Sequence, residues 1–182
     1  MTLLFVGRVA PNKCQQDLVA VLAVLRERFG VDARLVLVGG VSSVGYVEAV
    51  RGLAGRLGVE GVRGVCGVGV GCGVGGVVLG GGCVRECVRA RGFGVPLVEA
   101  MGFGVPVVAF GAAAVGETVG CGGVVLGEKS PVGVAAAVWR VLSDGGVREG
   151  LVARVGCGRG SWVRVSVPRM RAVLSSLLAE VS

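Results

Sequence analysis

RGFGVPLVEAMGFGVPVVAF, residues Arg91–Phe110, predicts a glycine-rich loop, a short helix and a buried strand in direct succession. Gly92 and Gly94 allow the backbone to approach a ligand closely, because glycine has no Cβ. Pro96 suits the first turn of a helix, and the apolar run Pro106–Phe110 is typical of a strand that is buried on both faces. A glycine loop that leads into a helix presents unpaired N–H groups and the positive end of the helix dipole. We therefore expect an anion such as phosphate to bind here.

Strands and helices alternate on both sides of this stretch. Short apolar runs predict strands at Leu3–Val6, Ala33–Val38 and Gly123–Leu126. Helices are expected at Gln15–Arg28, Ala113–Val119 and Val147–Val155, and from Pro168 onward. Another should begin after a cap at Ser42 or Ser43, with an apolar stripe of Tyr46, Val50, Leu53 and Leu57. A further one should begin at Ser130-Pro131 and stop at Asp144-Gly145-Gly146. This alternation implies a parallel sheet covered by helices on both faces. The predicted fold class is therefore α/β, a Rossmann-like doubly wound sheet in one domain over residues 1–182, with a ligand at the carboxyl ends of the strands.

The organising stretch also resembles the signature of family 4 of the retaining glycosyltransferases, where it lies in the nucleotide-sugar-binding C-terminal domain. The resemblance extends to FVGRVAPNK (Phe5–Lys13), to LVLVGG (Leu35–Gly40) and to Gly116-Glu117, and it covers most of Thr2–Leu142. It implies one half of a two-domain glycosyltransferase that transfers a hexose from a nucleotide sugar to an unknown acceptor with retention of configuration. It also implies that the nucleotide sugar is a substrate and that no cofactor or metal is needed.

On this resemblance, the loop after the first strand carries the catalytic cations. Arg8 and Lys13 match the Arg and Lys that the family places on the donor diphosphate. Preorganised cations at that position would stabilise the negative charge that grows on the leaving diphosphate. Gly7 would let this loop approach the donor closely. The alternative for Arg8 and Lys13 is an ordinary role in surface solubility.

The same resemblance assigns five donor-binding residues to the organising stretch. Glu99 matches the carboxylate that accepts hydrogen bonds from the ribose hydroxyls, although the helix dipole alone favours an acid in a first turn. Gly92, Phe93 and Gly94 match the loop whose amides touch the sugar and phosphate, and an ordinary turn is the alternative. Arg91 stands where the family has its first motif Glu, so the charge near the donor sugar is reversed.

Two further departures bear on activity. The resemblance implies an N-terminal acceptor domain, and this chain begins where that domain would end. The segment Val59–Cys87, which should hold a strand, a short helix and another strand, is filled with glycine. We therefore expect a truncated or decayed copy whose activity alone is doubtful. The second hypothesis is a non-catalytic nucleotide-binding module.

Composition limits the remaining classes of function. The chain has no histidine, which excludes Ser-His-Asp and Cys-His catalysis within it. Its net charge is +7, which leaves a basic protein that binds nucleic acid or an anionic membrane surface as a third hypothesis. The basic residues are scattered without a Lys/Arg run, so we expect no nucleic-acid partner. A zinc site from Cys83 and Cys87 has an unusual spacing, and we expect no metal.

Location and association follow from the same composition. The 7 cysteines, an odd number without a signal peptide, indicate reduced thiols and a cytoplasmic protein. Gly64–Val84 carries no charge, but its glycine content makes it a poor membrane helix, so membrane association is expected only peripherally. The broad apolar stripe of the helix from Pro168 to Val181 predicts self-association.

Overall fold

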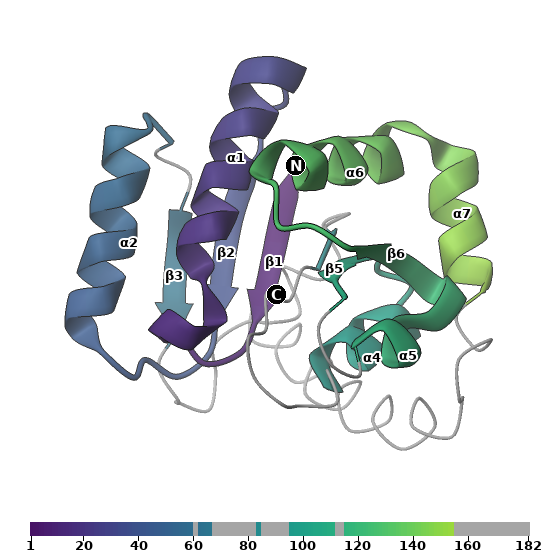
Figure 1. Cartoon of the computed structure of the whole chain (residues 1–182), viewed down its shortest axis with the longest axis horizontal. Helices are drawn as coiled ribbons and strands as arrows, with labels where there is room; N and C mark the ends of the chain where they lie inside the picture. The colour runs from purple at the N-terminus through teal and green to yellow at the C-terminus, as the bar shows by residue number, and fades with distance from the viewer. Residues whose placement is uncertain (60–61, 67–82, 85–94, 112–114, 155–182) are drawn as a thin grey trace, which may run out of the picture.

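A computed structural model describes residues 1–59, 62–66, 83–84, 95–111 and 115–154 of the 182 (Figure 1). Its strands form one sheet in the order β3-β2-β1-β4-β5-β6. The strands are β1 (Thr2–Val6), β2 (Arg34–Val38), β3 (Val62–Cys66), β4 (Cys83–Val84), β5 (Val107–Phe110) and β6 (Gly123–Leu126). Every pair of neighbouring strands is parallel. The order reverses between β1 and β4, as it does in a doubly wound Rossmann sheet, so the predicted fold class is confirmed.

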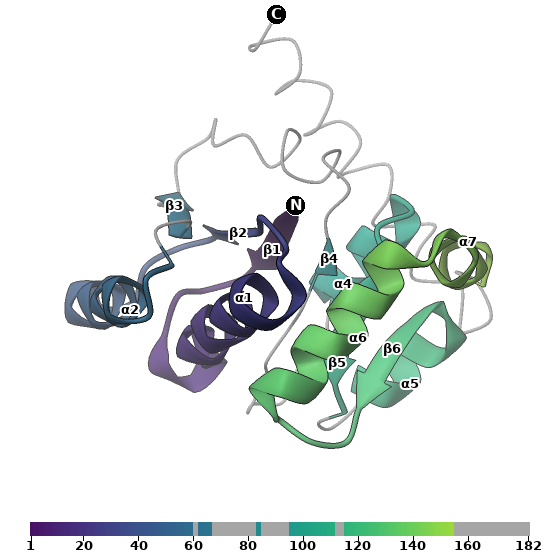
Figure 2. The ribbon, with the colours of Figure 1, turned by 90° about the horizontal axis from the view of Figure 1, so that it is seen from above.

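Helices cover both faces of this sheet. They are α1 (Gln15–Phe29), α2 (Val44–Arg56), α4 (Val95–Gly102), α5 (Val115–Val119), α6 (Pro131–Ser143) and α7 (Gly145–Ala153), with short 3-10 turns at Pro11–Lys13 and Gly120–Gly122. One buried cluster joins α1, α2 and α6 to the sheet, and a second joins α4 and α5 to its other face. Figure 2 shows α1 and α2 on one side of β1, β2 and β3.

The strand register explains how two separate cores form from adjacent residues. Leu3 pairs with Leu35, and both side chains face the α1 and α2 side. Leu4, one position later, faces the α4 and α5 side. Because successive side chains of a strand point to opposite faces, nearly continuous apolar strands supply both layers. The rings of Phe29 and Trp139, stacked with centroids 5.3 Å apart, add a contact between α1 and α6.

Most predicted elements lie where the sequence placed them, within one or two residues at the ends. The stripe of α1 is confirmed, since Leu18, Val21, Leu22 and Leu25 are all buried. Ser130 caps α6 by accepting a hydrogen bond from the Gly133 amide, and Pro131 opens that helix. Two strands, β3 and β4, occur in the glycine-rich segment Val59–Cys87, as the resemblance implied.

Two predictions about α2 and α7 were wrong in detail. The buried face of α2 consists of Val47, Val50 and Ala54, whereas Leu57 lies beyond the helix and is 37% exposed. The predicted stripe was therefore rotated by one position. α6 ends with Asp144 as its C-cap, as predicted, but Gly145-Gly146 are not a linker before the next helix. They form the first turn of α7, because the Asp144 side chain accepts from the Val147 amide and caps that helix.

Some predictions fall on residues that the structure does not describe. The last helix, from Pro168, and most of the uncharged segment Gly64–Val84 lie outside the described residues. Within the described ranges, no helix combines the length and apolar character that a membrane span requires.

Candidate functional site

The site lies where the strand order reverses. Leu3 pairs with Cys83 and Leu4 with Val84, so β1 and β4 leave the sheet side by side. β1 continues into the predicted cation loop, and β4 continues toward the glycine-rich loop that precedes α4. β1 and β4 therefore end side by side at the carboxyl end of the sheet, which is where doubly wound proteins bind ligands.

Glycines bring the ends of β1 and β2 into close approach. Gly7 follows β1 with φ +153°, and Gly39 follows β2 with φ +148°. A Cβ at Gly39 would lie 2.1 Å from the Gly7 carbonyl oxygen, so no larger residue fits there without a backbone shift. The Gly7 amide also donates to the Val38 carbonyl at 2.8 Å. The sequence analysis expected Gly7 to approach the donor, which stays a prediction, and it missed the contact with Gly39, which the glycine pair ending LVLVGG could have indicated.

The loop that carries Arg8 and Lys13 is anchored by the residues between them. Val9 and Ala10 are buried, while the Arg8 side chain is exposed and Lys13 is partly buried. The Val9 amide donates to the Gly40 carbonyl at 2.9 Å. The Val9 carbonyl accepts from the Ser42 hydroxyl, also at 2.9 Å. The two predicted cations thus lie on one loop that is hydrogen-bonded to the loop after β2.

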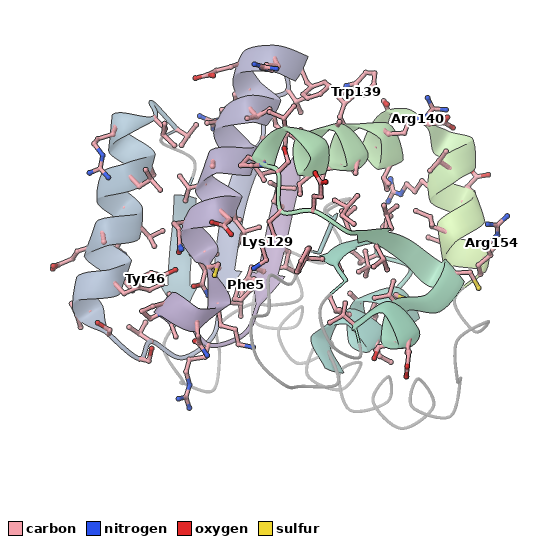
Figure 3. The ribbon with its side chains drawn as sticks, in the orientation of Figure 1. Phe5, Tyr46, Lys129, Trp139, Arg140 and Arg154 are labelled. Atoms are coloured by element: carbon pink, nitrogen blue, oxygen red, sulfur yellow. The ribbon has the colours of Figure 1, made fainter. Side chains whose placement is uncertain are left out.

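Two polar side chains hold this loop against the helices. The Gln15 Nε2 group donates to the Arg8 carbonyl at 3.0 Å. The Tyr46 hydroxyl, on α2, accepts from the Gln15 amide at 3.0 Å and donates to Gln16 Oε1. Figure 3 shows Tyr46 reaching from α2 toward the first turn of α1. Burial raises the pKa of Tyr46 above its usual value, so the hydroxyl keeps its proton at neutral pH.

Neither Gln15 nor Tyr46 was predicted as a site residue. Tyr46 was expected only in the apolar stripe of its helix, where it is partly buried. Gln15 could have been recognised, because it continues the buried stripe of Leu18 and Leu22 by one turn toward the N-terminus. A glutamine at an apolar stripe position indicates a buried polar side chain that needs a local partner.

The predicted donor-binding residues are placed only in part. Arg91, Gly92, Phe93 and Gly94 lie outside the described residues. Glu99 lies in α4, which starts at Val95, and its side chain is not among those described. The structure therefore gives the position of α4 but does not test these assignments.

One further cation lies at the same end of the sheet. Lys129 Nζ, on the loop after β6, is 4.9 Å from the centroid of the Phe110 ring at the end of β5. The contact has the geometry of a cation–π interaction. In the described part of the chain, no cluster of three His, Cys, Asp or Glu side chains could hold a metal. Cys83 lies in β4, and Cys87 is not described.

The comparisons with known proteins agree with this geometry. Residues 83–144 match the family model described as glycosyl transferases group 1. Compared with curated proteins, the chain has no significant sequence match.

Solved structures give the same assignment of the fold. HepE of Anabaena, in complex with UDP and glucose, is 23% identical with a TM-score of 0.69 over 97% of this chain and 48% of that one. The C-terminal domain of the group 1 glycosyltransferase LpcC of Francisella tularensis is 17% identical with a TM-score of 0.67, over 90% of this chain and 84% of that one. The pneumococcal O-GlcNAc transferase GtfA, in complex with UDP and GlcNAc, is 15% identical with a TM-score of 0.70, over 97% and 36%.

The matches cover different shares of the two proteins. The chain spans about half the length of HepE but most of the separate LpcC domain. In fold, the chain is thus similar to the Rossmann-like C-terminal domain of group 1, or family 4, glycosyltransferases.

Proposed function

We propose that this chain binds a nucleoside diphosphate sugar as the donor domain of a retaining glycosyltransferase. The observation that carries the proposal is the adjacency of β1 and β4 at the point where the strand order reverses. Because of it, the strand that precedes the Arg8–Lys13 loop lies beside the strand that precedes the signature motif Arg91–Phe110 in the sequence. The match of residues 83–144 to group 1 glycosyltransferases supports the same assignment.

In this proposal, Arg8 and Lys13 bind the diphosphate. Arg provides a planar fork of donors, and Lys provides a compact positive charge. Their loop is fixed by main-chain hydrogen bonds before the donor arrives, so little conformational freedom is lost on binding. When the sugar–phosphate bond breaks, negative charge grows on the diphosphate, and both cations stabilise it. Glu99 would hold the ribose, and the Gly92–Gly94 loop would contact the sugar.

Titration calorimetry with UDP, GDP and ADP tests the binding step. We expect at least one of them to bind, and Arg8→Ala with Lys13→Ala to weaken that binding by more than about tenfold, or about 1.4 kcal/mol. The matched control is Arg28→Ala with Arg51→Ala, which removes the same charge from exposed positions on α1 and α2. Equal affinity in the two double variants would contradict the assignment of Arg8 and Lys13.

A second candidate function is nucleotide binding without sugar transfer. Arg91 favours it, because guanidinium has donors only and cannot accept a hydrogen bond from a sugar hydroxyl. A hydrolysis assay with a UDP-sugar, in which the released free sugar is measured, separates the two functions. Turnover supports the transferase domain, and binding without turnover supports the non-catalytic module. Both functions suit the cytoplasm, where nucleotide sugars would be the partners.

A further inference from the structure

Gln15 is unusual among the side chains that the structure describes. It is the only fully buried polar one, with 0% of its surface exposed. It lies at the first position of α1, directly after the loop that carries Arg8 and Lys13. Buried polar side chains in a core usually have a specific hydrogen-bonding role, because an unpaired one is costly.

The two ends of the Gln15 amide have different surroundings. Its Nε2 group donates to the Arg8 carbonyl at 3.0 Å, whereas its Oε1 atom is buried and has no hydrogen-bond partner among the described residues. The opposite orientation of the amide would place two acceptors, Oε1 and the Arg8 carbonyl, against each other. The main-chain amide of Gln15 is held separately by the Tyr46 hydroxyl. The side chain therefore connects the end of the loop to its beginning.

This connection determines the separation of the two cations. Arg8 opens the loop and Lys13 ends its 3-10 turn, two positions before Gln15. With the Arg8 carbonyl bonded to the first residue of α1, the loop is closed into a ring of fixed size. Val9 and Ala10, which lie between the two ends of this ring, are buried, and Val9 packs in the main core, so the main chain there cannot shift freely.

We propose that Gln15 is a positioning residue for diphosphate binding, which acts by holding the Arg8 main chain at a fixed distance from Lys13. The inference rests on the proposed function, since it names the group that preorganises the same site. Preorganisation increases affinity because the loop does not have to be ordered when the ligand binds. Gln15 itself is buried and does not touch the ligand.

Gln15→Met separates this role from a general structural one. Methionine has a similar length and shape and adapts well to a buried site. The substitution removes the hydrogen bond to Arg8, but it also removes the unpartnered Oε1 atom, so we expect little change in the midpoint of thermal unfolding. We expect UDP binding to weaken by about fivefold, the size of one lost hydrogen bond. A residue with only a structural role would change the unfolding midpoint and leave the affinity unchanged.

The matched control is Leu18→Met, which also places methionine at a buried position on the same face of α1 but removes no polar group. It should leave UDP affinity unchanged. A third measurement uses an Arg8→Ala background, where Gln15→Met should have no additional effect on affinity, because the cation that it positions is gone.

Titration of the full chain with UDP distinguishes the outcomes. Weaker binding in Gln15→Met, with an unchanged unfolding midpoint and no effect in the Arg8→Ala background, supports the inference. Equal binding by wild type and Gln15→Met, or an equal loss in both backgrounds, overturns the inference and leaves the proposed function in place. Failure of the wild-type chain to bind UDP, GDP or ADP overturns the proposed function and this inference with it.

Discussion

Alanine at Gly39 should destabilise this chain strongly, because two independent costs act at that position. The φ of +148° lies in a region that is almost restricted to glycine, and occupying it with another residue costs about 1–3 kcal/mol. The added Cβ would also lie 2.1 Å from the Gly7 carbonyl oxygen and 2.6 Å from its carbon. These are main-chain atoms, so they can retreat only if the ends of β1 and β2 separate. Overpacking of this kind adds about 1–3 kcal/mol.

The expected loss for Gly39→Ala is therefore about 2–6 kcal/mol of the free energy of unfolding, a large part of the roughly 5–15 kcal/mol of a typical domain. Two other glycines separate the costs. Gly30 has φ +61° and open space around it, so Gly30→Ala should lose only the conformational cost of about 1–2 kcal/mol. Gly52 lies inside α2 with room for a methyl group, so Gly52→Ala should gain about 0.5–1 kcal/mol.

Chemical denaturation of the four proteins, followed by far-ultraviolet circular dichroism, measures this order. UDP titration adds a second readout, because separation of the strand ends moves the loop that starts at Gly7. A loss below about 1 kcal/mol in Gly39→Ala, or a loss no larger than that of Gly30→Ala, would show that the ends of β1 and β2 are not in close approach.

Three further predictions follow from single side chains. Tyr46 is the only tyrosine in the chain, and burial raises its pKa above 10.0, so tyrosinate absorbance should titrate later in the folded than in the denatured protein. Because the folded state holds this proton more tightly, the free energy of unfolding should fall as the pH rises above 10, and Tyr46→Phe should remove that part of the fall; equal midpoints in both states would contradict this. Asp144→Ala should cost about 1 kcal/mol by removing the cap of α7, and Asp144→Asn, which keeps a capping oxygen, should cost less in the same denaturation assay; equal losses would exclude the cap as the cause. Arg91→Glu should weaken binding of the free nucleoside diphosphate and increase preference for its sugar conjugate, and an unchanged ratio in a competition assay would show that position 91 does not face the donor sugar.

The sequence predicted the architecture well because the strands are nearly continuous apolar runs. A short apolar segment between turn residues is readily assigned as a buried strand. This holds for Leu3–Val6 and Gly123–Leu126, and both are strands. β3 and β4 could not be located from the sequence pattern. They lie in a glycine-rich segment, and glycine has no side chain to contribute to an alternation of apolar and polar residues. There the resemblance to a family, and not the pattern of residues, supplied the expectation of two strands.

Errors in the prediction arose where one local interaction decided the outcome. The pair Gly145-Gly146 normally ends a helix, but a hydrogen bond from the Val147 amide to Asp144 makes it a first turn. The apolar stripe predicted for α2 was assigned to the wrong face, because the alanines and valines of this helix are close together in the sequence and are compatible with more than one buried face. Long-range pairing decided the rest: β4 has only two residues, and its place beside β1 depends on partners from the start of the chain.

The residues of the candidate site came from the resemblance to a family and not from geometry. Arg8, Lys13 and Gly7 lie on the loop that follows β1, and their roles in binding remain predictions. Gln15 and Tyr46 were not identified, because a hydrogen bond between neighbouring helices depends on their packing angle. Glu99 and Arg91–Gly94 remain predictions, since their side chains are not described.

The strand order also has a consequence for the kinetics of folding. β1, β2 and β3 follow one another in the chain, so each pairing step closes a short loop and loses little chain entropy. Attachment of β4 to β1 closes a much longer loop through only two residue pairs, Leu3–Cys83 and Leu4–Val84. Because non-local pairs form slowly, the first half of the sheet should nucleate early. The junction of β1 and β4, beside the candidate site, should then form late, in the slowest phase of refolding.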